Sequence, residues 1–123
     1  MRLMGRVIFP GEAMGEVVKC EDPVVILGDI DPEKGVVEGC GNIADKVFVF
    51  PRGVGSTVGS YTLYALRYYG NAPKAIIVGE AEPIVVAGAI IAEIPTIDRI
   101  DVSKIQNGDI VKIRKNIVEV QNR

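Results

Sequence analysis

Runs of β-branched and aromatic residues, separated by Gly and Pro, fill the first half of the chain. They predict strands over 2–9 and 15–20, and over 24–27 either a brief buried strand or the anchor of a loop. The segment Asp31–Gly35 has the composition of a turn. Lys46–Phe50 is apolar at every position after its lysine, which is typical of a central strand covered on both faces.

The spacing of apolar residues becomes helical after residue 56 and predicts a helix that runs to Tyr69. Gly70 stands where a C′ glycine ends a helix. The next strand is expected at 75–78, so that strand, helix and strand form a β-α-β unit. The residues predicted to form the apolar face of this helix are Val58, Thr62, Ala65, Leu66 and Tyr69.

A second helix and three more strands are expected in the rest of the chain. Glu82-Pro83 begins the helix, with proline at the first helical position, and the helix runs to about Ala92. Its glycine and alanines allow it to pack closely against a neighbour. A short strand follows at 94–97, and a hairpin is formed by strands at 109–114 and 117–120.

These elements predict an α/β fold in one domain over residues 1–123. A chain of 123 residues has room for one domain, and 48% hydrophobic residues suffice to bury a core. The order of the elements predicts a shell of strands around a β-α-β-α-β centre, rather than a Rossmann sheet.

The charge and composition exclude several classes of function. Fourteen Lys and Arg against sixteen Asp and Glu give a net charge of −2, with no block of like charge, which argues against a nucleic-acid partner. The longest apolar stretch, 84–92, is far shorter than the roughly 20 residues of a membrane span. The chain has no histidine, so a Ser-His-Asp triad and His-ligated zinc are excluded within it.

Cys20 and Cys40 are too few to build a Cys₄ zinc site or to hold an iron–sulfur cluster. They can be buried thiols, a disulfide, or ligands shared with a partner. No signal peptide precedes them, which favours buried thiols and a cytoplasmic protein. No metal site and no cofactor are expected on this chain.

Arg52-Gly-Val-Gly-Ser-Thr57, called here the Gly-rich loop, is the most informative segment. Alternate glycines bring backbone N–H groups close to a bound anion, and Ser56 falls at the helix start, where the dipole also favours anions. The Arg52 guanidinium suits a carboxylate or a phosphate. The alternative is structural, because Ser56 is also an ordinary N-cap residue and the glycines can simply shape the turn.

Other polar residues are weaker candidates. Ser60 is expected on the helix surface, and Asp29 and Asp31 either act as paired carboxylates or cap their own turn. Asp98 and Arg99 follow a predicted strand, at a place where ligands often lie. Four tyrosines have helical spacing and predict core and interface packing: Tyr61, Tyr64, Tyr68 and Tyr69.

Five segments of the chain, in order, resemble the small swivel-domain subunit of the aconitase X family. The most specific match is Pro-Arg-Gly-x-Gly-Ser-Thr, at residues 51–57. The resemblance implies a swivelling β/β/α fold, in agreement with the predicted elements. The matching segments are 11–16, 27–35, 47–61, 72–77 and 87–95.

The resemblance also implies a reaction and a division of labour between two chains. In this family a large subunit carries the [4Fe-4S] cluster and most of the substrate site, and the small subunit closes over it with a serine that accepts a proton. The matching residue is Ser56, and the implied reaction is the dehydration of (R)-5-phosphomevalonate to trans-anhydromevalonate 5-phosphate. The expected residues for binding the small anionic substrate are Arg52, Gly53, Gly55, Thr57 and Asp31.

Two departures from the family pattern remain. Aconitase has an arginine downstream of the serine, where this chain has Thr57 and Val58, and Asp29 stands where many relatives have glycine. Two alternatives also stay open. One is a related dehydratase acting on another small hydroxy acid such as hydroxyproline. The other is a non-catalytic module that binds an anion or serves as a scaffold.

Overall fold

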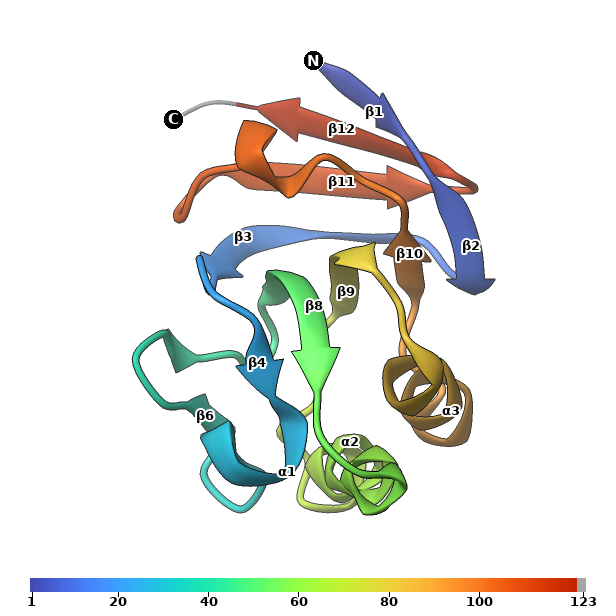
Figure 1. Cartoon of the computed structure of the whole chain (residues 1–123). Coiled ribbons are helices and arrows are strands. Elements are labelled where there is room, and N and C mark those ends of the chain that lie inside the picture. The colour runs from blue at the N-terminus through green and yellow to red at the C-terminus, as the bar shows by residue number, and fades with distance from the viewer. Residues whose placement is uncertain (122–123) are drawn as a thin grey trace.

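The computed structural model describes residues 1–121 and shows three layers (Figure 1). The strands join into one large mixed sheet in the order β1-β12-β11-β3-β8-β9-β10-β2, with β4 paired to β8, and a small sheet β5-β6-β7 lies beside it. The strands are β1 Arg2–Met4, β2 Arg6–Phe9, β3 Ala13–Lys19, β4 Val24–Val25, β5 Ile30–Asp31, β6 Val36–Val37, β7 Gly41–Asn42, β8 Val47–Val54, β9 Ala75–Glu80, β10 Thr96–Asp98, β11 Ile110–Arg114 and β12 Ile117–Gln121. The helices are α1 Ile26–Asp29, η1 Thr57–Gly59, α2 Ser60–Tyr68, α3 Pro83–Ala92 and η2 Val102–Lys104.

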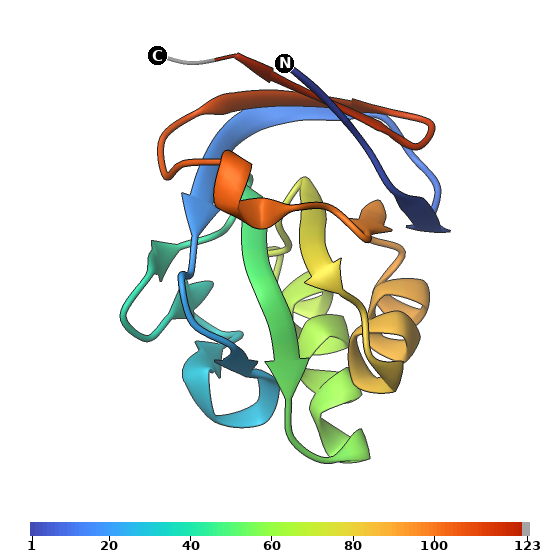
Figure 2. The ribbon, with the colours of Figure 1, turned by 45° about the horizontal axis from the view of Figure 1, so that its top comes forward.

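Parallel strands β8, β9 and β10 form the middle layer, with α2 and α3 on one face and the β3-β11-β12 strands curving over the other (Figure 2). Alternate residues of β8 enter two separate cores. Phe48 and Phe50 pack with Leu63 and Leu66 on the helix side, and Val47 and Val49 pack with strand residues such as Val111 on the other side. The predicted β/β/α arrangement is therefore confirmed, and β8 is covered on both faces as its sequence indicates.

Local signals place the helix ends. The Glu82 side chain accepts hydrogen bonds from the backbone N–H groups of Ile84 and Val85, both at 3.1 Å, and Pro83 follows at the first helical position of α3. Helix α2 ends before Gly70, whose φ of 76° is the left-handed conformation that glycine tolerates.

The two helices approach closely. A Cβ at Gly88 would lie 2.6 Å from Leu63 Cδ1, so the small residue is required for this packing. The structure thus confirms the predicted close packing of α3. The buried face of α2 is rotated relative to the prediction, because Leu63 is buried whereas Val58 and Tyr69 are 55% and 47% exposed.

Several strand boundaries also differ from the prediction. The expected strand at 2–9 is broken at Gly5, since β1 pairs with β12 and β2 pairs with β10. The run at 24–27 is a two-residue strand followed by the short helix α1, and the strand predicted at 94–97 begins at Thr96. Strand β8 continues to Val54, four residues beyond the apolar run, because β4 and β9 supply hydrogen-bonding partners there.

Candidate active site

The Gly-rich loop lies at the carboxyl end of β8, where the central strand passes into α2 (Figures 1 and 2). Its first residues, Arg52 to Val54, still belong to the strand, and η1 begins at Thr57. Gly55 has a φ of 129°, and its missing side chain is what allows the chain to leave the sheet here. The carboxyl ends of parallel strands are where α/β folds commonly bind ligands.

Ser56 has an extended backbone and occupies the N-cap position of η1. Its carbonyl oxygen accepts a hydrogen bond from the Gly59 N–H at 2.9 Å. Its side chain makes no capping bond and is exposed. Ser56 Oγ therefore does not cap the helix, although the sequence also allowed that function. The hydroxyl is accessible to a ligand or a partner.

Two other polar residues of the loop are also exposed. Arg52 lies opposite Glu80 in the parallel register of β8 and β9. Across residues 1–121 no carboxylate lies within ion-pair distance of the Arg52 guanidinium. Thr57 is exposed as well, and its carbonyl oxygen accepts a hydrogen bond from Ser60 Oγ at 2.9 Å. The loop thus presents a hydroxyl and a cation toward solvent.

Gly53 is buried and lies between two other elements. Its backbone pairs with Val24 of β4. A Cβ at this position would lie 2.8 Å from Glu82 Oε1 and 3.1 Å from Ile26 Cγ1. This glycine is therefore placed to set the shape of the loop, and its part in substrate binding remains a prediction.

The comparisons with known proteins point to one family. The sequence profile of the aconitase X swivel domain matches residues 2–120. The chain belongs to the aconitase X swivel-domain family.

Relatives and a solved structure agree with this assignment over nearly the full chain. The phosphomevalonate dehydratase small subunit of Thermococcus onnurineus is 51% identical, covering 98% of this chain and 99% of that protein. The protein of the same name from Methanosarcina acetivorans is 45% identical, covering 92% and 85%. The crystal structure of Thermococcus kodakaraensis aconitase X in its holo form matches with a TM-score of 0.95 and 49% identity, covering 99% of each chain.

Asp29 and Asp31 hold local turns in this swivel domain. Asp31 Oδ1 accepts hydrogen bonds from the N–H groups of Glu33 and Lys34, at 3.1 and 3.3 Å. Asp29 Oδ2 accepts from the Val25 N–H at 2.8 Å. Each carboxylate therefore caps its own segment, as the turn composition allowed, and a role of Asp31 in substrate binding remains a prediction.

The Asp98 side chain is buried in an ion pair that sequence reasoning did not find. Its carboxylate receives two hydrogen bonds from Arg6, at 3.0 and 2.8 Å, and a third from the Ala81 N–H at 3.2 Å. Hydrogen bonding to Asp98, together with the carboxylate charge, raises the pKa of Arg6. Asp98 therefore joins β2 to the turn that begins α3. The only sequence signal was an acidic residue directly after an apolar strand.

The tyrosine cluster and Ser60 differ from their predictions. All four tyrosines of the cluster are between 45% and 73% exposed, so the expected core packing is wrong. Ser60, expected on the helix surface, is buried and bonded back to Thr57. Periodicity alone did not show which face of α2 meets the sheet.

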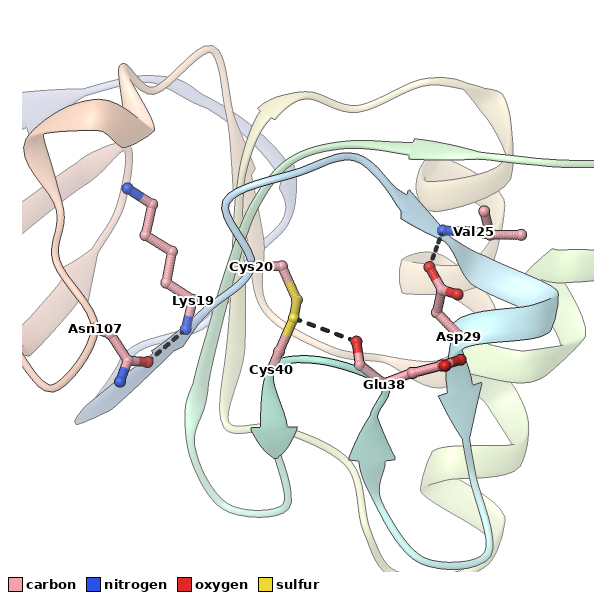
Figure 3. Close-up of a disulfide and its surroundings, with 7 residues drawn as sticks. All are labelled: Lys19, Cys20, Val25, Asp29, Glu38, Cys40 and Asn107. Carbon is pink, nitrogen blue, oxygen red and sulfur yellow. Dashed lines mark hydrogen bonds between the residues drawn. A yellow bond between two sulfur atoms is a disulfide. The ribbon is translucent and has the colours of Figure 1, made fainter.

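Cys20 and Cys40 form a disulfide, so the expectation of two buried thiols is wrong (Figure 3). The pairing requires the chain to bring residues 20 positions apart to a Cα–Cα distance of 5.4 Å. In the described part of the chain no group of three or more His, Cys, Asp or Glu could hold a metal ion. None of the helices within residues 1–121 is long and apolar enough to cross a membrane.

Proposed function

We propose that this chain is the small subunit of a phosphomevalonate dehydratase, a hydro-lyase that is active only together with a larger subunit. The observation that carries the proposal is identity of 45–51% over nearly the full chain with archaeal proteins bearing that name. The exposed, uncapped Ser56 hydroxyl on the Gly-rich loop supports the same conclusion from the structure.

The proposed role of this chain is to remove a proton. Dehydration of a 3-hydroxy acid takes a proton from the carbon next to the carboxylate, and the released electron pair forms the new double bond. The hydroxyl on the neighbouring carbon departs, and the balance is one water. Ser56 Oγ is our candidate for the base, since the chain has no histidine to take this part.

A serine oxygen can accept a proton as a base only after it has lost its own, so its deprotonated form must be stabilised enough to be populated. The first N–H groups of a helix have no intrahelical acceptor, and Ser56 stands directly before them. Arg52 adds a cation on the same loop. In a dry site, these groups favour negative charge on Oγ and on an anionic substrate. We assign binding of the anionic substrate to five residues: Arg52, Gly53, Gly55, Thr57 and Asp31.

The residues of this chain do not fit an iron–sulfur cluster. Both cysteines are joined in the disulfide, and the described residues offer no set of side chains that could hold a metal ion. We therefore assign the [4Fe-4S] cluster to the larger partner subunit, which would also close the site against water.

The test is turnover of 5-phosphomevalonate by the reconstituted pair of subunits. Ser56→Ala should lower turnover at least a thousandfold while the two subunits still co-elute. Ser103→Ala makes the same change at another exposed serine, within the short helix η2, and should leave turnover unchanged. A fully active Ser56→Ala complex would remove the proposed base. A wild-type pair that dehydrates hydroxyproline and not phosphomevalonate would remove the proposed substrate.

A further inference from the structure

The Cys20–Cys40 disulfide closes a loop that lies against the Gly-rich loop. Cys20 directly follows β3, and Cys40 lies between β6 and β7. The enclosed residues form β4, which pairs with β8, and then α1, β5 and β6, which lie beside the main sheet (Figure 3). The chain then returns to Cys20 at Cys40. The disulfide thus links the two ends of the segment 20–40.

Two contacts connect the enclosed segment to the Gly-rich loop. Strand β4 pairs in parallel with the end of β8, with Val24 opposite Gly53 and Val25 opposite Val54. The fully buried Ile26 follows immediately. It lies beneath both ends of the turn that carries Ser56, because a Cβ at Gly53 would lie 3.1 Å from its Cγ1 and one at Gly59 would lie 3.4 Å from its Cβ.

The turn in the middle of this segment, at residues 32–35, is hydrogen-bonded to a different part of the chain. Asn71 Nδ2 donates hydrogen bonds to the carbonyl oxygens of Pro32 and Glu33, at 3.1 and 2.8 Å. The turn at 32–35 is therefore held to the segment that follows α2 without the disulfide. Opening the disulfide would remove the covalent link nearer β4, next to the Gly-rich loop.

The disulfide is accessible from a cavity of about 420 Å³ that both cysteines line. Cys20 is 3% exposed, whereas Cys40 is half-buried, so Cys40 is the more exposed residue of the pair. Four carboxylates line the same cavity, from Glu21, Asp22, Asp29 and Glu38. Lys19 also lines it and pairs with Glu21 at 3.4 Å, so the carboxylates outnumber the cation by four to one.

We propose that Cys20–Cys40 is a site of thiol–disulfide exchange, and that the intact disulfide fixes the backbone of the Gly-rich loop. The reductant is a dithiol without negative charge. One thiolate attacks Cys40 Sγ, the S–S bond breaks, and Cys20 leaves as a thiolate that takes up a proton. The second thiolate of the reductant then displaces Cys40 from the mixed disulfide. Two electrons and two protons pass to the protein, and the reductant becomes a cyclic disulfide.

The reduced state has a defined place for one of its thiols. Cys40 Sγ lies 3.7 Å from the Glu38 carbonyl oxygen, which is available as an acceptor for the thiol that reduction creates. Cys20 remains in an apolar core with Val24 and Val37. Both thiols are therefore accommodated without unfolding the three layers.

The test is amide hydrogen exchange on the full-length chain before and after dithiothreitol. Reduction should speed exchange at least tenfold, and shift the amide resonances, in residues 24–26 and 53–59. Loss of the disulfide also lowers the global stability, which affects exchange in every core strand. The far side of the middle layer is therefore checked by its structure, and the amide chemical shifts of β11 and β12 should not change. The double variant Cys20→Ser/Cys40→Ser should show the reduced pattern without dithiothreitol and should not respond to it.

Three results would overturn the proposal. The first is two titratable thiols in the air-exposed wild-type protein. The second is unchanged exchange in residues 53–59 after reduction. The third is shifted amide resonances throughout, including β11 and β12, since the disulfide would then hold the structure of the whole fold rather than of one loop. None of these readouts uses enzymatic activity, so the proposal is tested separately from the dehydratase function.

A second arm tests the route through the acidic cavity. At low ionic strength and equal thiolate concentration, cysteamine should open the disulfide faster than mercaptoethanesulfonate, because the carboxylates attract its ammonium group. The difference should shrink in high salt. Equal rates for the two thiols at low salt would overturn attack from this cavity.

Discussion

Gly53→Ala tests whether the Gly-rich loop is held in shape by its neighbours. The added methyl would meet Glu82 Oε1 and Val85 Cγ2, both at 2.8 Å, and Ile26 Cγ1 at 3.1 Å. The first two distances are too short for any real contact, so side chains of α3 must move. Overpacking of this kind costs about 1–3 kcal/mol. Glu82 Oε1 also accepts the Val85 N–H, and losing that cap costs about 1 kcal/mol.

The expected destabilisation is therefore about 2–4 kcal/mol, or roughly 8–16 °C in the melting temperature of a domain this size. Urea unfolding and thermal melts followed by circular dichroism measure it. Gly28→Ala is the matched control, because its Cβ would lie 3.5 Å from the nearest atom, Val25 Cγ1, in ordinary contact. It should leave stability unchanged or raise it by up to about 1 kcal/mol, as Gly→Ala does in an unstrained helix.

A second substitution separates the packing explanation from a backbone effect. Val85→Ala removes one of the two atoms that the new methyl would meet. The double variant Gly53→Ala/Val85→Ala should be more stable than the sum of the two single changes predicts, by about 1 kcal/mol. A Gly53→Ala protein as stable as wild type, or strict additivity in the double variant, would refute the reasoning.

Three further predictions concern the rest of the fold. Replacing both Cys20 and Cys40 by serine should lower stability by about 3 kcal/mol, from the loop-closure entropy of 20 residues, and urea unfolding measures the loss. Asp98→Asn should cost about 2 kcal/mol in the same assay, because an amide cannot accept the paired guanidinium bonds. The side-chain and backbone hydrogen bonds of Ser103 lower the pKa of Asp101 from 3.8, so Ser103→Ala should raise it. The depressed pKa contributes stability above about pH 4, and this stability is lost as the pH falls through the pKa of the folded state. The wild-type protein should therefore lose its stability advantage over the variant in acid. NMR titration measures the pKa, and unfolding at several pH values measures the stability.

Much of the fold is predictable because its signals are local. The range predicted for α3 ends at Ala92, as observed, since Glu82, Pro83 and the residues after the helix mark its ends over a short stretch. The C-terminal hairpin is also predicted, because apolar and polar residues alternate in β11 as one face is buried and the other is solvated. These features depend on dihedral preferences and caps within a few residues.

The features that were missed depend on contacts between distant residues. The break at Gly5 is one example, because a Cβ there would clash with the Asp98 carbonyl oxygen, more than ninety residues along the chain. The buried face of α2 is another. Periodicity places residues around the helix, but the close approach of Gly88 in α3 decides that Leu63 lies inside and Tyr69 outside.

For the candidate site, the sequence by itself determined the loop. The glycines, the serine before a helix and the absence of histidine were all readable from residues 52–57 and the composition. The tertiary structure decided that Ser56 Oγ caps nothing and that Gly53 lies between Glu82 and Ile26. It also decided that the two cysteines pair. The physical reason is that a turn is encoded by neighbouring dihedral angles, whereas the partners of a buried atom are set by which distant segments the folded chain brings together.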